Sequence, residues 1–197
     1  MRPLSVLYAM VLLSGCHAGQ QGSPEPRSRV DDRASDYVVA TVLGRTVTRE
    51  DLKWESIDAL RAAVFVPILE QYRAERNIVA TDAAVESCAR LISGWQPVAV
   101  PDDVIRKVAA DHVLTWNTSK ALFEEYGGTV IFQQFNALEP VGAYLTLLRD
   151  HEKRGTLHFN DARSAERFLK YFTGAHMVVD PEKVDYSVPW WEKESDN

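Results

Sequence analysis

Positive charge is scarce in this chain. The 197 residues contain 22 Lys and Arg against 28 Asp and Glu, which gives a formal net charge of −6. An acidic chain lacks the basic footprint of a nucleic-acid-binding protein and has no general attraction to anionic lipid. We therefore expect no nucleic-acid partner. The hydrophobic share of 46% is ordinary and allows a sizeable core.

Motifs of common catalytic sites are also missing. The sequence has no G-x-S-x-G nucleophile motif and no glycine loop of the kind that cradles phosphate. His151-Glu152 begins like a zinc helix motif, but no histidine follows at the fourth position. We therefore expect no catalytic residue, no cofactor and no metal. A metal site where His158 and Asp161 approach His151 is a minor alternative, and an enzyme of unrecognised type stays open.

The first of the two cysteines, Cys16, lies just after a short apolar run at the N-terminus. A short apolar run from Leu4 to Leu13 follows Met1-Arg2 and is too short to span a bilayer. It leads into Leu13-Ser14-Gly15-Cys16, which resembles a bacterial lipobox, where small residues admit the peptidase and the thiol takes the diacylglycerol. The resemblance implies a signal peptide over 1–15 and lipidation at Cys16. The alternative is an ordinary secretory signal beside a chance cysteine.

The predicted anchor suggests a location and a tether. Two or three acyl chains on Cys16 hold a protein on the bilayer much more firmly than one. His17, in place of Asp, favours the periplasmic face of the outer membrane by analogy with lipoprotein sorting. Residues 17–36 are polar and rich in Gly, Pro and Ser, so they predict a flexible tether. Cys88 lies on an apolar helical face, and we expect it to be buried and inert.

The stretch after the tether predicts a β-hairpin followed by a long helix. Val38–Val42 and Thr46-Val47 are β-rich and flank a turn at Leu43-Gly44, although leucine tolerates positive φ poorly. Thr48 and Asp51 have the spacing of a capping box, which predicts that a helix follows directly. The apolar spacing continues to Tyr72. Pro67 lies inside it and predicts a kink or two helices.

The remaining chain predicts a mainly α fold: a single helical domain over 37–191 with a short N-terminal β-hairpin, one additional β pair and a disordered tail at 192–197. A strand at 129–135 is expected to pair with 157–159. The predicted helices cover 81–92, stopped by Gly94, then 102–126, 139–154 and 161–173.

The stretch that follows the predicted tether resembles one known protein family. The wording V-A-x-V-x-G-x-x-V-x-x-x-D-L from Val39 to Leu52, with Ile78–Val85 as a second landmark, resembles the start of SurA/PrsA-type periplasmic folding factors. The resemblance covers about the N-terminal half of the mature chain and implies a helical, peptide-binding SurA-N-like domain. The glycine-rich signature and histidine pair of the parvulin module are missing. Peptidyl-prolyl isomerase activity is therefore not implied.

The aromatic residues supply the functional candidates. Unfolded polypeptides share exposed apolar side chains, so an apolar groove binds them with little sequence selectivity. We expect such a groove between helices 55–76 and 102–126 and the returning tail, with these peptide-binding residues: Trp116, Phe123, Trp190 and Trp191. The alternative is that the tail only closes the core. Gln133 and Gln134, in an apolar run, either line a polar groove or face water.

The function predicted from these features is that of a non-catalytic, chaperone-like envelope lipoprotein. It would contact the bilayer through acylated Cys16 and bind unfolded or partner envelope polypeptides. The alternative is a structural or assembly lipoprotein with one dedicated partner.

Overall fold

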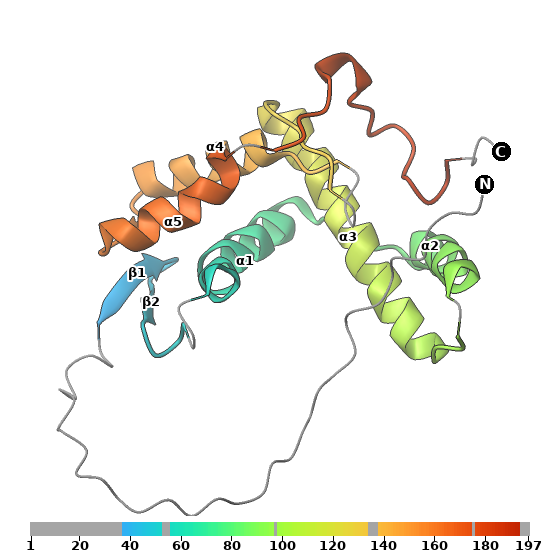
Figure 1. The fold of residues 1–197 in the computed structure, drawn as a ribbon, viewed down its shortest axis with the longest axis horizontal. Coiled ribbons are helices and arrows are strands. Elements are labelled where there is room, and N and C mark those ends of the chain that lie inside the picture. The colour runs from blue at the N-terminus through green and yellow to red at the C-terminus, as the bar shows by residue number, and fades with distance from the viewer. Residues whose placement is uncertain (1–36, 53–55, 97, 134–137, 175, 194–197) are drawn as a thin grey trace, which may run out of the picture. The chain divides into compact units, whose positions relative to one another are not determined.

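The computed structural model describes residues 37–52, 56–96, 98–133, 138–174 and 176–193. Within these ranges it has five α-helices and a small antiparallel sheet with the strand order β2-β1-β3 (Figure 1). In chain order the elements are β1 (Val38–Val42), β2 (Arg45–Thr48), α1 (Ile57–Arg76), α2 (Asp82–Trp95), α3 (Asp102–Tyr126), α4 (Val141–Lys153), β3 (Leu157–Phe159), α5 (Ala162–Thr173) and a 3-10 turn, η2 (Pro181–Lys183).

This architecture confirms the mainly α fold with an N-terminal hairpin. The predicted signal peptide at 1–15, the lipidation site Cys16 and the tether at 17–36 lie outside the described residues. Of the predicted tail, only 192 and 193 are described.

The hairpin turn is held by a strained leucine. Leu43 has φ 51° and Gly44 has φ 78°, the two positive values that a tight two-residue hairpin turn requires. The backbone N–H of Leu43 donates a hydrogen bond of 2.7 Å to the carbonyl oxygen of Thr156, just before β3. This bond ties the turn to the third strand, which accounts for a leucine where Asn or Gly is usual.

The start of α1 differs from the prediction. Thr48 and Asp51 do form the reciprocal hydrogen bonds of a capping box, with the Thr48 backbone N–H 2.8 Å from Asp51 Oδ2. They close a turn, however, and the helix begins only at Ile57. The effective cap is Ser56, whose hydroxyl accepts a hydrogen bond of 3.0 Å from the N–H of Ala59.

Pro67 does not divide α1. One continuous helix runs through it to Arg76, so the expectation of two helices is wrong. Ile68, Leu69 and Tyr72 are buried on the helix face that follows the proline, and this packing keeps the helix intact despite the missing backbone donor. Asn77 ends the helix in the left-handed conformation at φ 53°.

The third strand pairs with a partner that was not expected. Leu157–Phe159 lies antiparallel to β1, with Val42 opposite Leu157 and Ala40 opposite Phe159. It does not pair with residues 130–133, the described part of the predicted strand at 129–135. There Ile131 forms isolated bridges to Glu139 and Val178. β1 has one edge on β2 and offers its other edge to β3, which completes a three-stranded sheet.

The later helices begin and end close to their predicted positions. Thr81 and Asp161 cap α2 and α5 with their side-chain oxygens. α3 spans Asp102–Tyr126 and ends at Gly127, whose φ is 62°. α2 continues to Trp95, so Gly94 lies within its last turn and does not stop it.

The buried apolar residues form two clusters. The first, which we call the sheet core, joins the sheet to α1, α4 and α5 and contains Val42, Val64, Ile68, Leu148, Phe168 and Phe172. The second, the tail core, joins α2, α3 and the chain after α5 and contains Cys88, Ile105, Val113, Trp116, Tyr186 and Trp191. α3 contributes Leu122 to the first cluster and Trp116 to the second, so it connects them. Cys88 is fully buried as predicted, and burial raises the pKa of its thiol to about 11.

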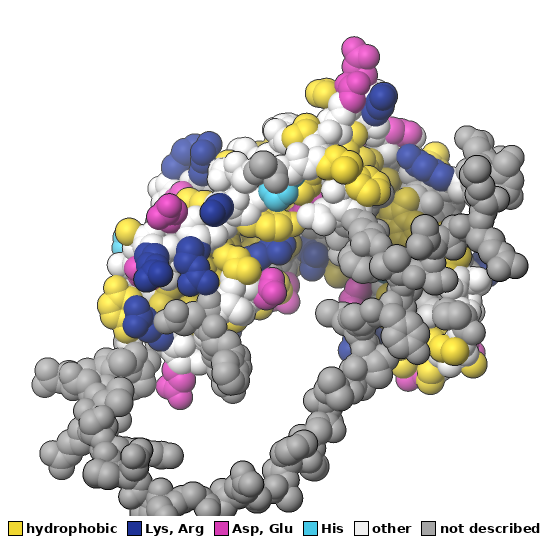
Figure 2. Space-filling model, in the orientation of Figure 1, with side chains coloured by type: hydrophobic (Ala, Val, Ile, Leu, Met, Phe, Trp, Pro, Cys, Tyr) yellow, Lys and Arg dark blue, Asp and Glu magenta, His cyan; other side chains and the backbone are white. Residues whose placement is uncertain are grey.

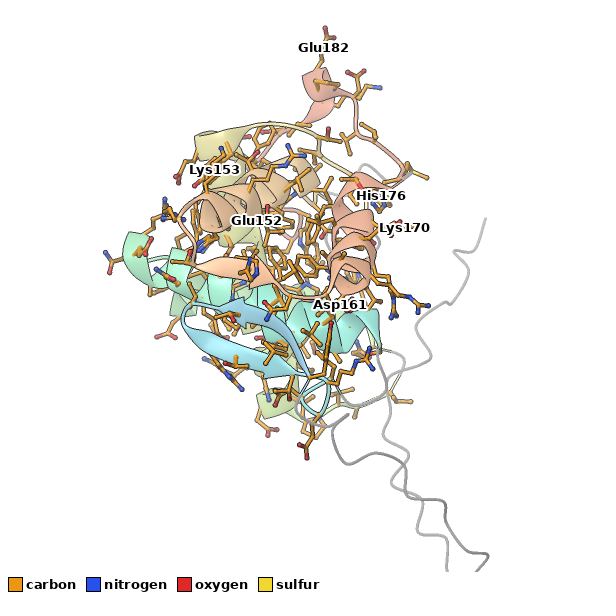
Figure 3. The ribbon with its side chains drawn as sticks, turned by 90° about the vertical axis from the view of Figure 1, so that its left-hand side faces the viewer. Glu152, Lys153, Asp161, Lys170, His176 and Glu182 are labelled. Atoms are coloured by element: carbon orange, nitrogen blue, oxygen red, sulfur yellow. The ribbon has the colours of Figure 1, made fainter. Side chains whose placement is uncertain are left out.

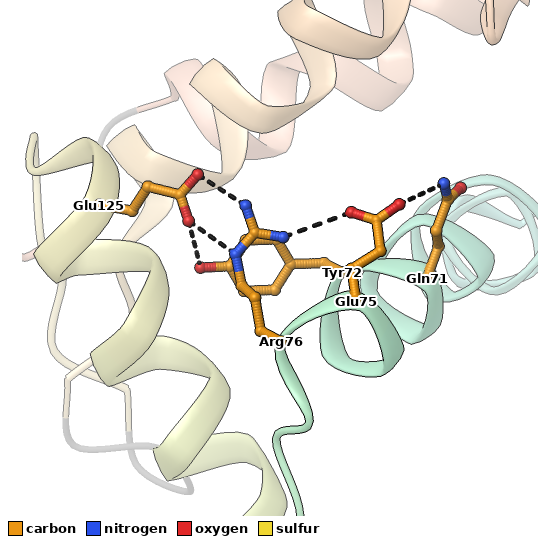
Figure 4. A network of polar contacts seen from close by, with 5 residues as sticks. All are labelled: Gln71, Tyr72, Glu75, Arg76 and Glu125. Carbon is orange, nitrogen blue, oxygen red and sulfur yellow. Dashed lines mark hydrogen bonds and ion pairs between the residues drawn. The ribbon is translucent and has the colours of Figure 1, made fainter.

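A polar network fixes α1 against the C-terminal end of α3 (Figure 4). Arg76 donates to both carboxylate oxygens of Glu125, at 2.8 Å from Nε and 2.7 Å from Nη2. Tyr72 donates its hydroxyl to the same carboxylate at 3.0 Å, and the Arg76 guanidinium lies 3.8 Å from the centre of the Tyr72 ring. The bond from Arg76 lowers the pKa of Glu125, which keeps the pair ionised.

Candidate functional site

The tail core is built from a helical hairpin and an inserted segment of irregular chain. The inner faces of α2 and α3 supply Cys88, Ile92, Ile105 and Val113. The chain after α5 returns over these helices and inserts aromatic rings between them. Tyr186 lies 5.1 Å from Trp116 between ring centres and donates its hydroxyl to the carbonyl oxygen of Leu138 at 2.9 Å.

The structure separates the four predicted peptide-binding residues. Trp116 and Trp191 are buried, at 3% and 6% exposure, with ring centres 6.0 Å apart. Both belong to the tail core, so a peptide does not reach them in this conformation. Trp190 and Phe123 are half-buried. The tail therefore closes a core, which was the alternative stated from the sequence.

Trp190 leads to an exposed apolar surface. Its ring stacks on Trp95 at 5.8 Å and meets His112 edge-on at 5.5 Å. His112, Val108 and Val104 follow one another at four-residue steps along α3, and this spacing makes them neighbours on one side of the helix. Trp95 is 56% exposed, Val104 46% and Val108 40%. We call these five residues the tryptophan face.

The tryptophan face carries little charge. Burial lowers the pKa of His112, so its imidazole is neutral at neutral pH. A cavity of about 280 Å³ opens between α2 and α3, and its lining includes the ion pair of Arg106 and Glu86. Figure 2 shows yellow side chains at the end of the molecule where α3 begins in Figure 1. The tryptophan face is thus an uncharged apolar area on helices that also carry charged side chains.

Val104 and Val108 belong to one broad apolar stripe in the sequence of α3, together with Ile105, Trp116 and Leu122. The structure buries the last three and exposes the two valines. α2 and the tail therefore cover only part of the apolar stripe near the start of α3. The width of this stripe was the signal in the sequence for a surplus apolar face.

Phe123 belongs to a second apolar area. It lies against Tyr186 at 5.4 Å and lines a cavity of about 230 Å³ together with Val130, Val178 and Val184. Phe132, between α3 and α4, and Met177 and Val178, after α5, are exposed, and the N–H of Phe132 donates to the carbonyl oxygen of Met177 at 2.9 Å. Phe123 and Trp190 therefore do not line one groove.

The polar candidate residues also lie in different surroundings. His151 is buried, and its Nδ1 lies 2.9 Å from the hydroxyl of Thr156, while His158 is exposed on β3. Across the described ranges, no group of three or more His, Cys, Asp or Glu side chains is arranged to hold a metal ion. Gln133 donates weakly to the hydroxyl of Tyr171 at 3.4 Å, and Gln134 lies outside the described residues.

Two further findings bear on function. In the part of the chain that the structure describes, no helix combines the length and the apolar character needed to cross a membrane. No family model, curated protein or solved structure matches the chain.

Proposed function

We propose that this protein is a lipid-anchored envelope protein that binds exposed apolar segments of other polypeptides, without catalysis, on the tryptophan face. The observation that carries the proposal is the tryptophan face itself, where Trp95, Val104 and Val108 are each at least 40% exposed. Neighbouring exposed apolar side chains of this kind are typical of binding surfaces.

The composition of the face suits a polypeptide. Two stacked tryptophans offer broad rigid rings that lose little conformational entropy on binding, and tryptophan is enriched at binding hot spots. The valines add apolar area without directional hydrogen bonds, so contacts depend on apolarity more than on one sequence. This favours apolar stretches that share no motif, as unfolded clients present them.

The cell-envelope setting rests on the sequence. Leu13-Ser14-Gly15-Cys16 after a short apolar run supports acylation of Cys16, and the opening from Val39 to Leu52 supports a SurA-N-like domain without its isomerase module. An anchored domain with an apolar face would hold clients close to the membrane surface. The second apolar area at Phe132 and Met177 favours the alternative of one dedicated partner, since a single partner would cover both areas at once.

A pair of matched substitutions tests the binding surface. Val108→Asp places a charge in the tryptophan face, whereas Val66→Asp places the same charge on α1 at a position of similar exposure, 42%. We expect Val108→Asp to weaken binding of a reduced, carboxymethylated polypeptide by about 10-fold or more, because a buried unpaired charge costs at least 1–3 kcal/mol. The quenching of tryptophan fluorescence on titration measures the affinity.

Val66→Asp should bind as the wild type does. Equal affinity for both variants and the wild type would remove the tryptophan face as the binding site. A captured set of many polypeptides agrees with chaperone-like binding, whereas one stoichiometric partner points to the dedicated role.

Cys16→Ser tests the anchor. The wild-type protein should fractionate with membranes and enter detergent, and the variant should not, because it lacks the thiol that takes the diacylglycerol. Membrane retention of Cys16→Ser at the wild-type level would contradict the lipoprotein interpretation.

A further inference from the structure

Basic side chains gather on one face of α5, in contrast to the acidic balance of the whole chain. Arg163, Arg167 and Lys170 are exposed and lie four and three residues apart, which places them on the same side of the helix. Glu166 is the one acidic residue of α5. Figure 2 shows dark blue side chains clustered where α5 and β1 lie in Figure 1, and Figure 3 shows Asp161 at the start of this helix and Lys170 further along it.

The inner side of this helix is fully engaged in the sheet core. Phe168 and Phe172 are buried, with ring centres 5.4 Å apart. α5 therefore cannot insert into a bilayer as an amphipathic helix without unfolding the domain. Its basic side faces away from this core.

A pocket of about 60 Å³ opens beside the basic face. Arg49, Arg163 and Arg167 line it with Ser56 and Asp161, so the described side chains of its lining carry three positive charges and one negative. The carboxylate of Asp161 is turned to its own helix, where it accepts from the backbone N–H groups of Arg163 and Ser164 at 3.2 Å. A single water molecule needs about 10–15 Å³ of cavity volume, so a pocket of about 60 Å³ has room for a group of several heavy atoms.

The surrounding backbone adds to the positive potential. Ser56 precedes the first residue of α1 and Asp161 precedes the first residue of α5, so two helix N-termini face this region. The positive ends of the two helix dipoles act together with the guanidinium groups. Planar guanidinium groups suit the oxygens of a phosphate, which accept paired hydrogen bonds.

We propose that the pocket and the basic face of α5 bind the phosphate of an anionic lipid headgroup in the membrane that carries the protein. The inference rests on the proposed anchor at Cys16. The described domain begins at Tyr37, whose ring lies 4.9 Å from the guanidinium carbon of Arg49, so the first described residue lies beside a residue of the pocket. The tryptophan face comes from α2, α3 and the tail, which contribute nothing to the pocket lining. A docked domain thus keeps its apolar face for clients.

The experiment uses the acylated protein in vesicles of phosphatidylcholine alone and of phosphatidylcholine with phosphatidylglycerol. Amide hydrogen exchange reports whether residues 49–52, 56–60 and 162–170 are covered. We expect slower exchange only in vesicles with phosphatidylglycerol, and its loss in 1 M salt, where charges are screened within about 3 Å. A third arm adds inorganic phosphate to the protein in detergent and distinguishes the headgroup from free phosphate.

Two triple variants remove the same charge from different faces. Arg163→Gln/Arg167→Gln/Lys170→Gln should lower the ratio of docked to undocked protein about 100-fold, at about fivefold per cation near an anionic surface. Arg90→Gln/Lys107→Gln/Lys183→Gln, at exposed positions elsewhere, should leave exchange as in the wild type.

Several outcomes overturn the proposal. These are equal exchange of the wild type in both vesicles, equal effects of the two triple variants, and protection by inorganic phosphate that phosphatidylglycerol does not exceed. Failure of the proposed anchor looks different, because the protein would then leave both kinds of vesicle in every variant. The vesicle comparison with the wild-type protein decides the matter even if a triple variant folds poorly.

Discussion

The sheet core and the tail core are closed in different ways. In the sheet core, regular elements surround the buried side chains, and the strands of the sheet satisfy one another's backbone groups. In the tail core, α2 and α3 supply two walls, and the third is irregular chain held by inserted rings. The two cores therefore depend on different interactions: paired backbone in one, and buried aromatic surface in the other.

Both regions contain a buried polar group without a hydrogen-bond partner. Among the described residues these are the indole Nε1 of Trp191 in the tail core and Nε of Arg61 on α1. A buried donor left unpaired costs about 1–3 kcal/mol, so this cost does not distinguish the two cores. Because the irregular wall of the tail core lacks the paired strands of the sheet core, we expect the tail core to open first, with α2 and the tail exchanging their amides first.

The difference has a functional side. The tryptophan face lies on the region that we expect to open first, while the basic face of α5 lies on the sheet core. Binding surfaces are drawn from the less stable parts of a fold, where local adjustment costs little. Four experiments test this comparison between the two cores.

Removal of residues 188–197 has the largest expected effect. The deletion takes away Trp191, and loss of a buried tryptophan costs about 3–5 kcal/mol. The apparent melting temperature should fall by roughly 10–15 °C, at about 2–4 °C per kcal/mol. Hydrogen exchange should become fast in α2 while α1 and α5 stay protected, and an apolar dye should bind the opened surface.

Phe168→Ala is the matched change in the sheet core. Phe168 is fully buried, so the expected loss is again about 3–5 kcal/mol. Here α1, α2 and α5 should lose protection together, because the sheet core supports the connection through α3. If the tail deletion also exposes α1 and α5, the two cores form a single cooperative unit and the comparison fails.

Tyr186→Phe tests the hydrogen bond that fastens the tail. The change removes the 2.9 Å bond to the carbonyl oxygen of Leu138 and keeps the ring between Trp116 and Phe123. We expect a loss of about 1–2 kcal/mol in the free energy of unfolding, measured by chemical denaturation. An unchanged midpoint would mean that packing alone holds the tail.

Acidification has the smallest expected effect and acts on both regions. Burial lowers the pKa of His112 beside the tail core and of His151 beside the sheet core, from an ordinary value of 6.5. The unfolded chain then binds protons more readily than the folded one, so stability is lost as the pH falls below 6.5. The melting temperature should fall between pH 7.5 and 5.5.

Two carboxyl groups with lowered pKa values affect stability only below this pH range. Asp51 and Glu125 have lowered pKa values, and the stability that they contribute is lost only as the pH approaches their ordinary values of 3.8 and 4.5 or falls below them. His112→Gln should remove the part of the pH dependence that belongs to the tail core, and His151→Gln the other part. A melting temperature that rises on acidification would contradict the assignment of both histidines.

Much of the local structure was predictable because short-range rules govern it. Four-residue apolar spacing located α1 and α3, and side-chain caps located the starts of α2 and α5. The start of α1 was mispredicted because the capping-box pair Thr48 and Asp51 can equally close a turn, and nothing local distinguishes the two. The burial of Cys88 followed from its helical neighbours.

The candidate site was predicted only in part. Trp190 was expected to bind peptide and is half-buried at the tryptophan face, where binding stays a prediction, whereas Trp116 and Trp191 are buried. Trp95 was not among the sequence candidates, because only the stacking against Trp190 shows that it belongs to the same surface. The sequence around a tryptophan does not distinguish a ring inside a core from a ring at its border.

The sequence by itself determined the helical periodicity, the caps, the hairpin and the acidic net charge, since each depends on neighbouring residues or on composition. Only the tertiary structure decided that β3 pairs with β1, that Val104 and Val108 stay uncovered, and that Arg49 meets Arg163 and Arg167 at one pocket. These contacts join segments that are far apart in the chain. Many such pairings are compatible with the same local pattern, and burial of the apolar surface as a whole selects among them.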